Sequence, residues 1–429
     1  MSHYLTVEYA KIFRAADFPD EERNANAVYL PAAAFAALRE LTDSRSRDNI
    51  FRSGRRGGRE YLQVQNYVGI AETPDGTVLE ILPKIYFRGD GREQQVQVRR
   101  AFLRMLRTLP DLPFKQLGEA YLQAARFPLL EIFIAAFTEA VLTLLQGGLQ
   151  QNYTLREAND PYLRGKLLFH KNIKQNLGKP YRFYTESDAF QQNVAPNRLL
   201  RTAVDFLLTR TRSYQNRNYL QQIKTVFADV PCSQNLSADL QKSEIENRLY
   251  PHYTAPLQWA KIFLQKQSYV HFAGENSGLS LLFPADRLFE GYVGRKFAHH
   301  AEDYQISLQD SRHHLLFTER GEGKFNLRPD ITAEHEKEIL LFDTKWKIID
   351  PARPGYGIRQ ADLYQMLAYA EKYAQAGKTV KTALIYPQNS DFLQELSALR
   401  FYRERLPVRI GCWDFSIEEK ENVLFLLGG

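Results

Sequence analysis

The chain has 429 residues, of which 44% are apolar and 25% are charged; this is typical of a globular protein and predicts two or three domains. Two cysteines are too few for a zinc cluster or a disulfide framework, so we expect a cytoplasmic protein. The net charge of +6 is modest, the N-terminus does not resemble a signal peptide, and the longest apolar segment is interrupted by Glu131 and Glu139, so no membrane association is expected.

Residues 1–92 are predicted to form a β-rich domain. Apolar and polar residues alternate over Tyr4–Tyr9, and strands are expected at Tyr61–Ile70 and Val78–Ile85. The segment 44–60 is rich in arginine and glycine. It is either a solvated hairpin tip or a contact with a partner or with phosphate.

Residues 93–278 are predicted to be a mainly helical, basic middle region, with helices near Val96–Leu109 and over Phe127–Gln146. Between Arg164 and Lys224, twelve Lys and Arg residues accompany three acids, and aromatic residues are interleaved. Basic groups release counterions from phosphates and aromatic rings stack on bases, so nucleic-acid contact is favoured over a merely solvated helical face. The candidate residues for this contact are Arg164, Lys166, Lys171, Lys174, Arg182, Arg198 and Arg201.

Residues 279–429 alternate between helical and strand patterns, which indicates a mixed sheet flanked by helices. Helices are expected at 283–297 and 359–376, and strands at 339–342 and 380–386. The predicted fold class is therefore a multi-domain α+β protein with a β-rich N-terminal domain, a helical basic middle region and a C-terminal domain built on this sheet.

Two carboxylates follow the strand pattern of this last domain. Asp343 comes directly after the apolar run 339–342, and strand geometry places Asp343 and Lys345 on one face. Asp330 lies on or beside a second short strand. Two converging carboxylates can hold Mg²⁺, a hard cation that prefers oxygen ligands. This is the PD-(D/E)xK arrangement of metal-dependent nucleases, although two ordinary strand ends with a surface lysine would show the same short pattern.

Three more residues bear on that interpretation. Glu290 lies one helix before the strands, where a further carboxylate can reach the metal, or it is a solvated glutamate. Gln365 and Tyr369 are four residues apart on the predicted helix after Lys345, so they share a face that could look into the site. The same QxxxY helix is found in RecB-like nucleases.

The glycine- and lysine-containing segments do not predict a nucleotide site. Gly377-Lys378-Thr379 resembles the end of a phosphate-binding loop, but position 372, where the first glycine belongs, is a lysine. The segment also follows a helix and precedes a strand, which is the reverse of the required order. We therefore expect no nucleotide to be bound by this chain.

Taken together, motifs spread in one order over most of the chain resemble McrC, the nuclease subunit of the McrBC modification-dependent restriction system. They are Leu79-Glu-Ile-Leu-Pro83-Lys84-Ile, Leu163-Arg-Gly165-Lys166-Leu, Asn197-Arg198-Leu-Leu, Leu288-Phe-Glu290-Gly-Tyr-Val, Arg328-Pro-Asp330-Ile, Asp343-Thr-Lys345-Trp-Lys347, Asp362-Leu-Tyr-Gln365-Met-Leu-Ala-Tyr369 and Ile385-Tyr-Pro387.

The resemblance implies a protein that docks through its N-terminal β-rich domain onto a ring of AAA+ GTPase subunits (McrB). It would stimulate GTP hydrolysis and cut double-stranded DNA when translocation stalls, while the partner recognises methylated cytosine. Asp330, Asp343 and Lys345 match the catalytic positions of the family. Residues 279–429 would then be a PD-(D/E)xK nuclease domain.

The expected chemistry is phosphodiester hydrolysis with Mg²⁺, or Mn²⁺ in its place. Asp330, Asp343 and the carbonyl of Thr344 would hold the metal, and Lys345 would position the attacking water. Glu290 would complete the metal site, and the remaining catalytic candidates, Gln365 and Tyr369, would orient it. Two alternatives stay open at this point: a non-cleaving DNA-binding or regulatory subunit, and a stand-alone RecB-like repair nuclease.

Overall fold

The computed structural model of the chain describes residues 2–19, 22–23, 27–43, 50–85, 87, 91–109, 112–246, 250–264, 279–374, 378–396, 399–401 and 407–428. Contacts divide the chain into two compact units, Met1–Leu129 with Ser268–Gly429, and Leu130–Gln267. The first unit therefore combines the two ends of the chain, which the sequence predicts as separate domains. The division into three domains stays a prediction.

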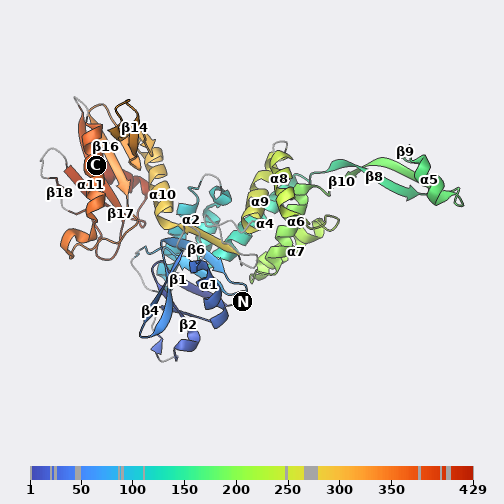
Figure 1. Cartoon of the computed structure of the whole chain (residues 1–429), viewed down its shortest axis with the longest axis horizontal. Helices are drawn as coiled ribbons and strands as arrows, with labels where there is room; N and C mark the ends of the chain where they lie inside the picture. Colours follow the sequence, from blue (N-terminus) through green and yellow to red (C-terminus); the bar gives the residue numbers. More distant parts are fainter. Residues whose placement is uncertain are drawn as a thin grey trace. The chain divides into compact units, whose positions relative to one another are not determined.

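The N-terminal part of the first unit contains two four-stranded sheets (Figure 1). One has the order β3-β2-β5-β4 and packs against helix α1 (Ala32–Asp43). Phe35 of α1, Leu62 of this sheet and Ile81 of the other sheet belong to one buried core. The strands of the first sheet are β2 (Lys11–Arg14), β3 (Ala27–Leu30), β4 (Phe51–Arg56) and β5 (Arg59–Val64).

The arginine-rich segment, as far as the structure describes it, is a hairpin. Strands β4 and β5 pair antiparallel, and Gly57 and Gly58 form the turn between them with φ values of 56° and 78°. Arg59 forms an ion pair of 2.6 Å with Glu22. The hairpin interpretation is thus confirmed from Phe51 onward. Contact with a partner stays a prediction, and residues 44–49 lie outside the described part.

The second N-terminal sheet has the order β1-β7-β6-β11, and its last strand comes from the far end of the chain. Its strands are β1 (His3–Val7), β6 (Tyr67–Glu72), β7 (Val78–Leu82) and β11 (Ser280–Pro284). Gly69 has a φ of 130°, and a Cβ there would lie 2.0 Å from the Leu281 carbonyl oxygen, so glycine permits the pairing of β6 with β11. The helix that follows β11 therefore starts from the N-terminal sheet.

The C-terminal part is a six-stranded mixed sheet of order β12-β15-β16-β17-β19-β18 with helices around it (Figure 1). Strands β16, β17 and β19 run parallel, and helix α11 connects the first two, as a parallel pair requires. Its elements are α10 (Ala285–His300), β12 (Gln305–Leu308), β15 (Ile331–Glu334), β16 (Glu338–Thr344), α11 (Gln360–Tyr373), β17 (Thr379–Pro387), β18 (Leu399–Arg400), β19 (Pro407–Trp413) and α12 (Glu419–Leu427). This confirms the mixed sheet expected from the sequence.

Strand β16 separates two layers of side chains. Ile339 and Leu341 share a buried core with residues of α11, whereas Phe342 packs on Phe297 of α10 with the ring centroids 4.8 Å apart. Since side chains alternate along a strand, Asp343 points to the same side as Ile339 and Leu341. The carboxylate therefore faces α11.

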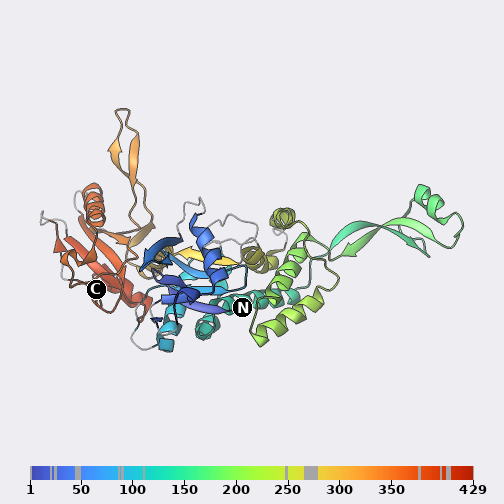
Figure 2. The ribbon, with the colours of Figure 1, turned by 60° about the horizontal axis from the view of Figure 1, so that its bottom comes forward.

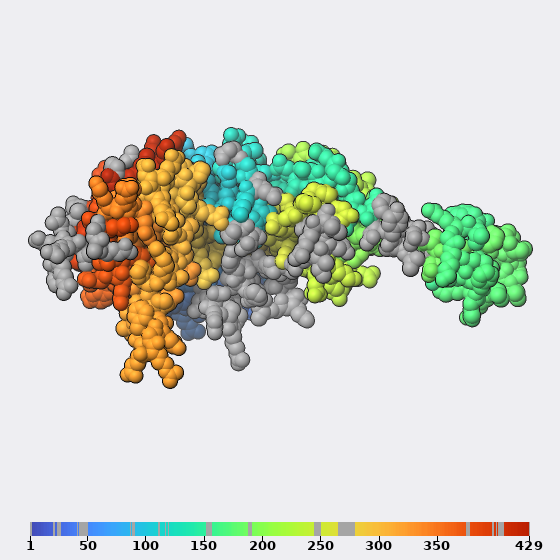
Figure 3. Space-filling view, turned by 90° about the horizontal axis from the view of Figure 1, so that it is seen from above, coloured from blue at the N-terminus to red at the C-terminus, as the bar shows by residue number. Residues whose placement is uncertain are grey.

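A two-stranded ribbon projects from this part of the unit (Figures 2 and 3). It consists of β13 (His313–Phe317) and β14 (Gly323–Leu327), which form a two-stranded sheet of their own among the described strands. At the base of the ribbon, the centroid of the His313 ring lies 4.2 Å from that of the Tyr373 ring in α11. This contact holds the ribbon against the helix. The ribbon ends at Leu327, so the Pro329-Asp330 segment follows directly from it.

The second unit is built on a bundle of helices. They are α4 (Leu129–Gln146), α6 (Ala195–Leu208), α7 (Tyr214–Val226), α8 (Leu236–Glu246) and α9 (Thr254–Leu264). By length and composition α4 could cross a membrane, but 56% of it is buried. Glu131 of α4 also accepts hydrogen bonds from the Thr211 hydroxyl (2.8 Å) and the Asn216 amide (2.8 Å). Helix α4 therefore packs in the core of its own unit.

The middle region departs from the helical prediction over residues 152–191. Strands β8 (Asn152–Asp160), β9 (Lys166–Leu167) and β10 (Phe183–Gln191) form a sheet that carries α5 (Phe169–Asn176) at its end. Figure 1 shows them as an elongated arm that extends from the helices of its own unit. Most residues from 161 to 182 are exposed, and among the strand residues whose burial is described only Thr185 is buried, so the sequence shows no alternating apolar pattern here.

One side chain holds the base of this arm. Asn197 donates hydrogen bonds to the carbonyls of Gln150 (2.9 Å) and Gln192 (2.8 Å), which flank β8 and β10. Its own carbonyl accepts a bond of 2.7 Å from the Tyr253 hydroxyl, and that hydroxyl accepts one of 2.6 Å from the Gln150 N–H. Asn197 is fully buried. The Asn197-Arg198 motif therefore joins both strands of the arm to the helices.

We predict that Asn197→Ala destabilises the protein by about 2 kcal/mol, since buried hydrogen-bond partners lose their bonds. Urea unfolding of the full chain measures this. Asn218→Ala, at an exposed position of α7, is the control, and we expect it to change stability by less than about 0.5 kcal/mol. Equal effects of the two substitutions would contradict the role of Asn197.

Candidate active site

Asp330 and Asp343 meet where β15 begins and β16 ends. Asp330 Oδ2 accepts two hydrogen bonds of 2.7 Å, from the backbone N–H and the hydroxyl of Thr344. Since Thr344 follows Asp343 in the chain, these bonds hold the two acidic residues beside one another. The sequence pattern does not indicate this role of the Thr344 side chain, and metal binding by its carbonyl stays a prediction.

Lys345 lies on the same side as Asp343, as strand geometry predicts. Its ammonium group forms an ion pair with Asp343 Oδ2, and its backbone N–H donates to the Ile385 carbonyl at 2.8 Å. Asp343 is buried, and the Lys345 side chain is 18% exposed. The ammonium is therefore fixed beside the carboxylates and remains accessible from the cleft.

A hydrogen-bonded chain connects Lys345 to α11. The ammonium donates to Gln365 Oε1 at 3.1 Å, and Gln365 Nε2 lies 2.7 Å from the Tyr369 hydroxyl. That hydroxyl donates in turn to the Arg328 carbonyl at 2.9 Å, two residues before Asp330. The two helix residues thus share the predicted face, and they tie the lysine to the loop that carries the first carboxylate.

Glu290 also lines this cleft, from α10. Burial, followed by the charges of Asp330 and Asp343, raises the pKa of Glu290 to about 7. Within the described residues, however, no three His, Cys, Asp or Glu side chains are grouped closely enough to hold a metal ion. Direct binding of a metal by Glu290 stays a prediction.

The cleft around these residues has a volume of about 400 Å³. Arg328 and Arg359 line it with exposed side chains, and neither forms an ion pair within the part of the chain that the structure describes. Other lining residues are Tyr9, Asn66, Asp286, Glu290, Asp330, Asp343, Thr344, Lys345, Trp346, Lys347 and Gln365. Because Tyr9 and Asn66 belong to the N-terminal part, both ends of the chain build this cleft.

The donors suit Mg²⁺ chemically. Burial and the neighbouring Asp330 charge raise the pKa of Asp343 to about 6, and burial also raises the pKa of Asp330. A divalent cation would reduce the repulsion between these carboxylates. Mg²⁺ is commonly held by one or two carboxylates together with waters and substrate phosphates, so two protein carboxylates are a sufficient set.

A buried contact beyond the predicted residues joins this site to the N-terminal sheet. The Trp346 indole N–H donates to both carboxylate oxygens of Glu8, at 2.7 and 2.8 Å. Burial raises the pKa of Glu8 to about 7. These residues lie 338 positions apart, so local sequence patterns could not have revealed the contact.

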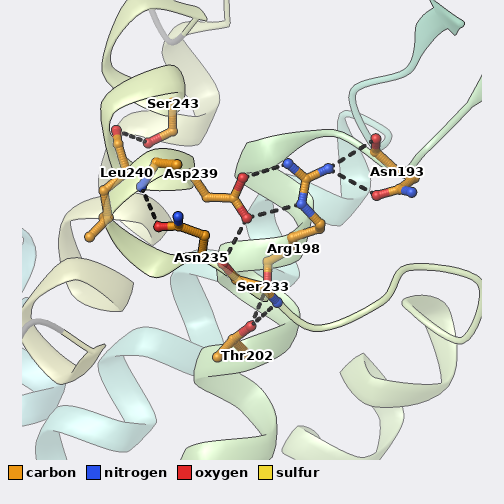
Figure 4. Close-up of polar contacts among 9 residues, drawn as sticks. Asn193, Arg198, Thr202, Ser233, Asn235, Asp239, Leu240 and Ser243 are labelled. Atoms are coloured by element: carbon orange, nitrogen blue, oxygen red, sulfur yellow. Dashed lines mark hydrogen bonds and ion pairs between the residues drawn. The ribbon is translucent and has the colours of Figure 1, made fainter.

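Two of the predicted nucleic-acid residues, Arg198 and Arg201, lie on helix α6 and bond to residues of their own unit. Figure 4 shows Arg198 bound to Asp239, at 2.5 and 3.0 Å, and to Asn193. Arg201 bonds to Asp205 at 3.0 Å and to the Phe227 carbonyl at 3.0 Å. These contacts stabilise the packing of the helices. Nucleic-acid contact by the two arginines stays a prediction.

The other five predicted residues lie on the arm. Arg182 donates to the Asn159 carbonyl, and Lys171 forms an ion pair with Glu157. Arg164, Lys166 and Lys174 are exposed, and none of them has an ion-pair partner among the described residues. The end of the arm thus presents these three cations to solvent. The active-site carboxylates belong to the other unit.

Comparisons with known proteins give the family and the fold of the chain. Residues 62–387 match the family model described as McrBC 5-methylcytosine restriction system component. The fold is similar to that of a chain in the refined half-complex from the tetradecameric assembly of Thermococcus gammatolerans McrB AAA+ hexamers with bound McrC. The identity is 18%, the TM-score is 0.68, and 99% of each chain is covered.

A chain in the cryo-EM structure of the Thermococcus gammatolerans McrBC complex is also similar, with 21% identity and a TM-score of 0.51. That match covers 71% of this chain and 89% of the other. Comparison with the curated proteins finds no match. At these identities the structural likenesses show the fold.

The raised pKa values predict that metal binding strengthens as pH rises, because protons compete with the cation for the carboxylates. If Asp343 alone titrates as a ligand, Mn²⁺ affinity should rise about twofold between pH 6 and pH 8; if Glu290 also binds, the rise should be about twentyfold. Calorimetry with Mn²⁺ measures the affinity. Glu290→Gln is the matched variant that should reduce a twentyfold rise to a twofold one. An affinity that falls with pH would contradict this site.

Proposed function

The chain belongs to the family of McrBC 5-methylcytosine restriction system components, and from this premise we propose that it is the Mg²⁺-dependent DNA endonuclease subunit of such a system. It would cut DNA while an AAA+ GTPase partner translocates, and it would stimulate the GTPase of that partner. The observation that carries the nuclease assignment is the hydrogen-bonded group of Asp330, Asp343 and Lys345 in one cleft.

The residues divide the chemical work among them. Asp330, Asp343 and the Thr344 carbonyl would hold Mg²⁺. When bound there, the ion lowers the pKa of a coordinated water and neutralises charge on the phosphate. The Lys345 ammonium orients the attacking water and stabilises the negative charge that develops on the phosphate oxygens.

The helix α11 keeps that ammonium in position. Gln365 accepts from Lys345 and contacts Tyr369, which donates to the backbone before Asp330. Glu290 would complete the metal site or accept a proton near the leaving oxygen, since its raised pKa lies near neutrality. Catalysis would therefore depend on β15, β16, α10 and α11 together.

The substrate is proposed to be double-stranded DNA. Arg328 and Arg359 line the cleft without an ion-pair partner in the described residues, and guanidinium groups bind phosphates in a bidentate manner. They are well placed to contact phosphates beside the scissile one. The exposed Arg164, Lys166 and Lys174 of the arm add a further proposed contact with nucleic acid.

The partner is proposed to be a McrB-like AAA+ GTPase ring. The first compared structure contains McrB AAA+ hexamers with bound McrC, and the likeness covers 99% of this chain. Docking would use the N-terminal β-rich sheets, and the complex would work in the cytoplasm. The partner would supply nucleotide hydrolysis and recognition of the modified base.

We predict that Asp343→Ala abolishes DNA cleavage, because it removes a carboxylate on which both the metal and Lys345 depend. Cleavage of methylated and unmethylated plasmid DNA is measured with Mg²⁺, with and without the GTPase partner. Docking and GTPase stimulation should stay intact, which separates loss of chemistry from loss of assembly. Retained cutting would refute the site. Cutting without the partner would instead indicate a stand-alone nuclease, and no cutting by the wild type would indicate a regulatory subunit.

We predict that Arg328→Ala and Arg359→Ala each weaken DNA binding and reduce the salt dependence of log Kd by about 1, since each would remove one phosphate contact. Fluorescence anisotropy with a duplex oligonucleotide in EDTA at several salt concentrations gives both quantities. Lys420→Ala, which removes an exposed cation of α12 outside the cleft, is the control. An unchanged slope in the two arginine variants would exclude them as phosphate contacts.

A further inference from the structure

Glu8 is a buried carboxylate at the end of β1, with 2% of its surface exposed. Its Oε1 accepts from the Lys84 backbone N–H at 2.9 Å, and both of its oxygens accept from the Trp346 indole. It forms no ion pair within the described part of the chain. A buried carboxylate without such a partner is costly, so its hydrogen bonds indicate a specific role.

The N-terminal sheets fix the position of this carboxylate. The Glu8 N–H donates to the Leu82 carbonyl at 3.1 Å, and the Tyr9 N–H donates to the Val64 carbonyl at 3.0 Å. Lys84, which donates to the side chain, follows β7 directly. The backbone that carries Glu8 is therefore bonded to both N-terminal sheets, and Oε1 is bonded to the residue that lies two positions after β7.

Trp346 lies between two lysines that are bound to acids. Lys345 before it pairs with Asp343 and donates to Gln365, and Lys347 after it bonds to Asp362 of α11 at 2.5 Å. The Trp346 ring also packs on Phe289, the neighbour of Glu290, with the ring centroids 5.2 Å apart. A shift of the indole would therefore disturb both the end of β16 and the helix α10.

We infer that Glu8 is a positioning residue of the cleavage site, which acts through the Trp346 indole to fix the geometry of Asp343 and Lys345. The inference rests on the proposed nuclease function. In this arrangement, cleavage at the C-terminal sheet depends on the N-terminal sheet through the hydrogen bonds between Glu8 and Trp346. These bonds fix a direction, which apolar packing alone would not do. A partner docked on the N-terminal sheets would contact the same structural element that holds Glu8.

Steady-state cleavage by the complex with the GTPase partner tests the inference. We expect Glu8→Gln and Trp346→Phe each to lower kcat about tenfold with little change in KM, as is usual for residues that orient metal-site groups. The kcat of the double variant should be no lower than that of the less active single variant, because both substitutions remove the same interaction.

Glu72→Gln is the matched control. Glu72 is another buried carboxylate of the same sheet, and it accepts a hydrogen bond from the Leu279 backbone N–H at 3.1 Å. The Glu72→Gln substitution should lower the stability of the protein without changing kcat. If Glu72→Gln lowers kcat as much as Glu8→Gln does, or if the Glu8 and Trp346 variants cleave like the wild type, the inference is overturned.

A second readout does not require cleavage. The indole N–H resonance of Trp346 can be assigned by its loss in Trp346→Phe, and we expect it to move in Glu8→Gln. Addition of Mg²⁺ should shift it in the wild type but not in Asp343→Ala. If the wild-type resonance does not shift when Mg²⁺ is added, the proposed coupling between the Trp346 indole and the metal site is overturned. If wild-type protein fails to cleave while the resonance still responds to Mg²⁺, the proposed function fails and the positioning role stands.

Discussion

The structure of the site depends on placing two acidic side chains close together in a buried position. Burial raises the cost of ionising both carboxyl groups, and the Asp330 charge raises it further for Asp343. The protein offsets it in two ways. Thr344 donates two hydrogen bonds to Asp330, and Lys345 places an ammonium beside Asp343. The two carboxylates are thus held together in a state that favours the binding of a cation.

The Lys345 ammonium needs more than one acceptor for this arrangement to serve catalysis. If Asp343 were its single partner, sharing that carboxylate with a cation would release the lysine to solvent. Gln365 supplies a second acceptor, and its contact with Tyr369 fixes the amide. Because Tyr369 also donates to the backbone just before Asp330, the network connects the lysine to both acids. The Gln-x-x-x-Tyr spacing therefore has a physical reason at this site.

Much of this arrangement could be predicted from the sequence because it depends on local geometry. The alternation along β16 placed Asp343 and Lys345 on one side, and the spacing of Gln365 and Tyr369 placed them on one helical face. The strands of the arm over residues 152–191 were missed because their sequence carries no apolar alternation, and most of the residues between them, 161–182, are exposed. The charge pattern of the middle region likewise could not distinguish the internally paired Arg198 from the exposed Lys174.

The contact of Glu8 with Trp346 could not be predicted, since it joins positions that only the complete fold brings together. Nevertheless, it explains why two sequence motifs far apart in the chain belong to one functional unit. Lys84 of the Leu-Pro-Lys segment and Trp346 of the Thr-Lys-Trp segment donate to the same carboxylate. A hydrogen bond between buried groups requires a defined direction as well as proximity. The orientation of β16 relative to the N-terminal sheet is therefore specified at the point where the strand reaches the candidate active site.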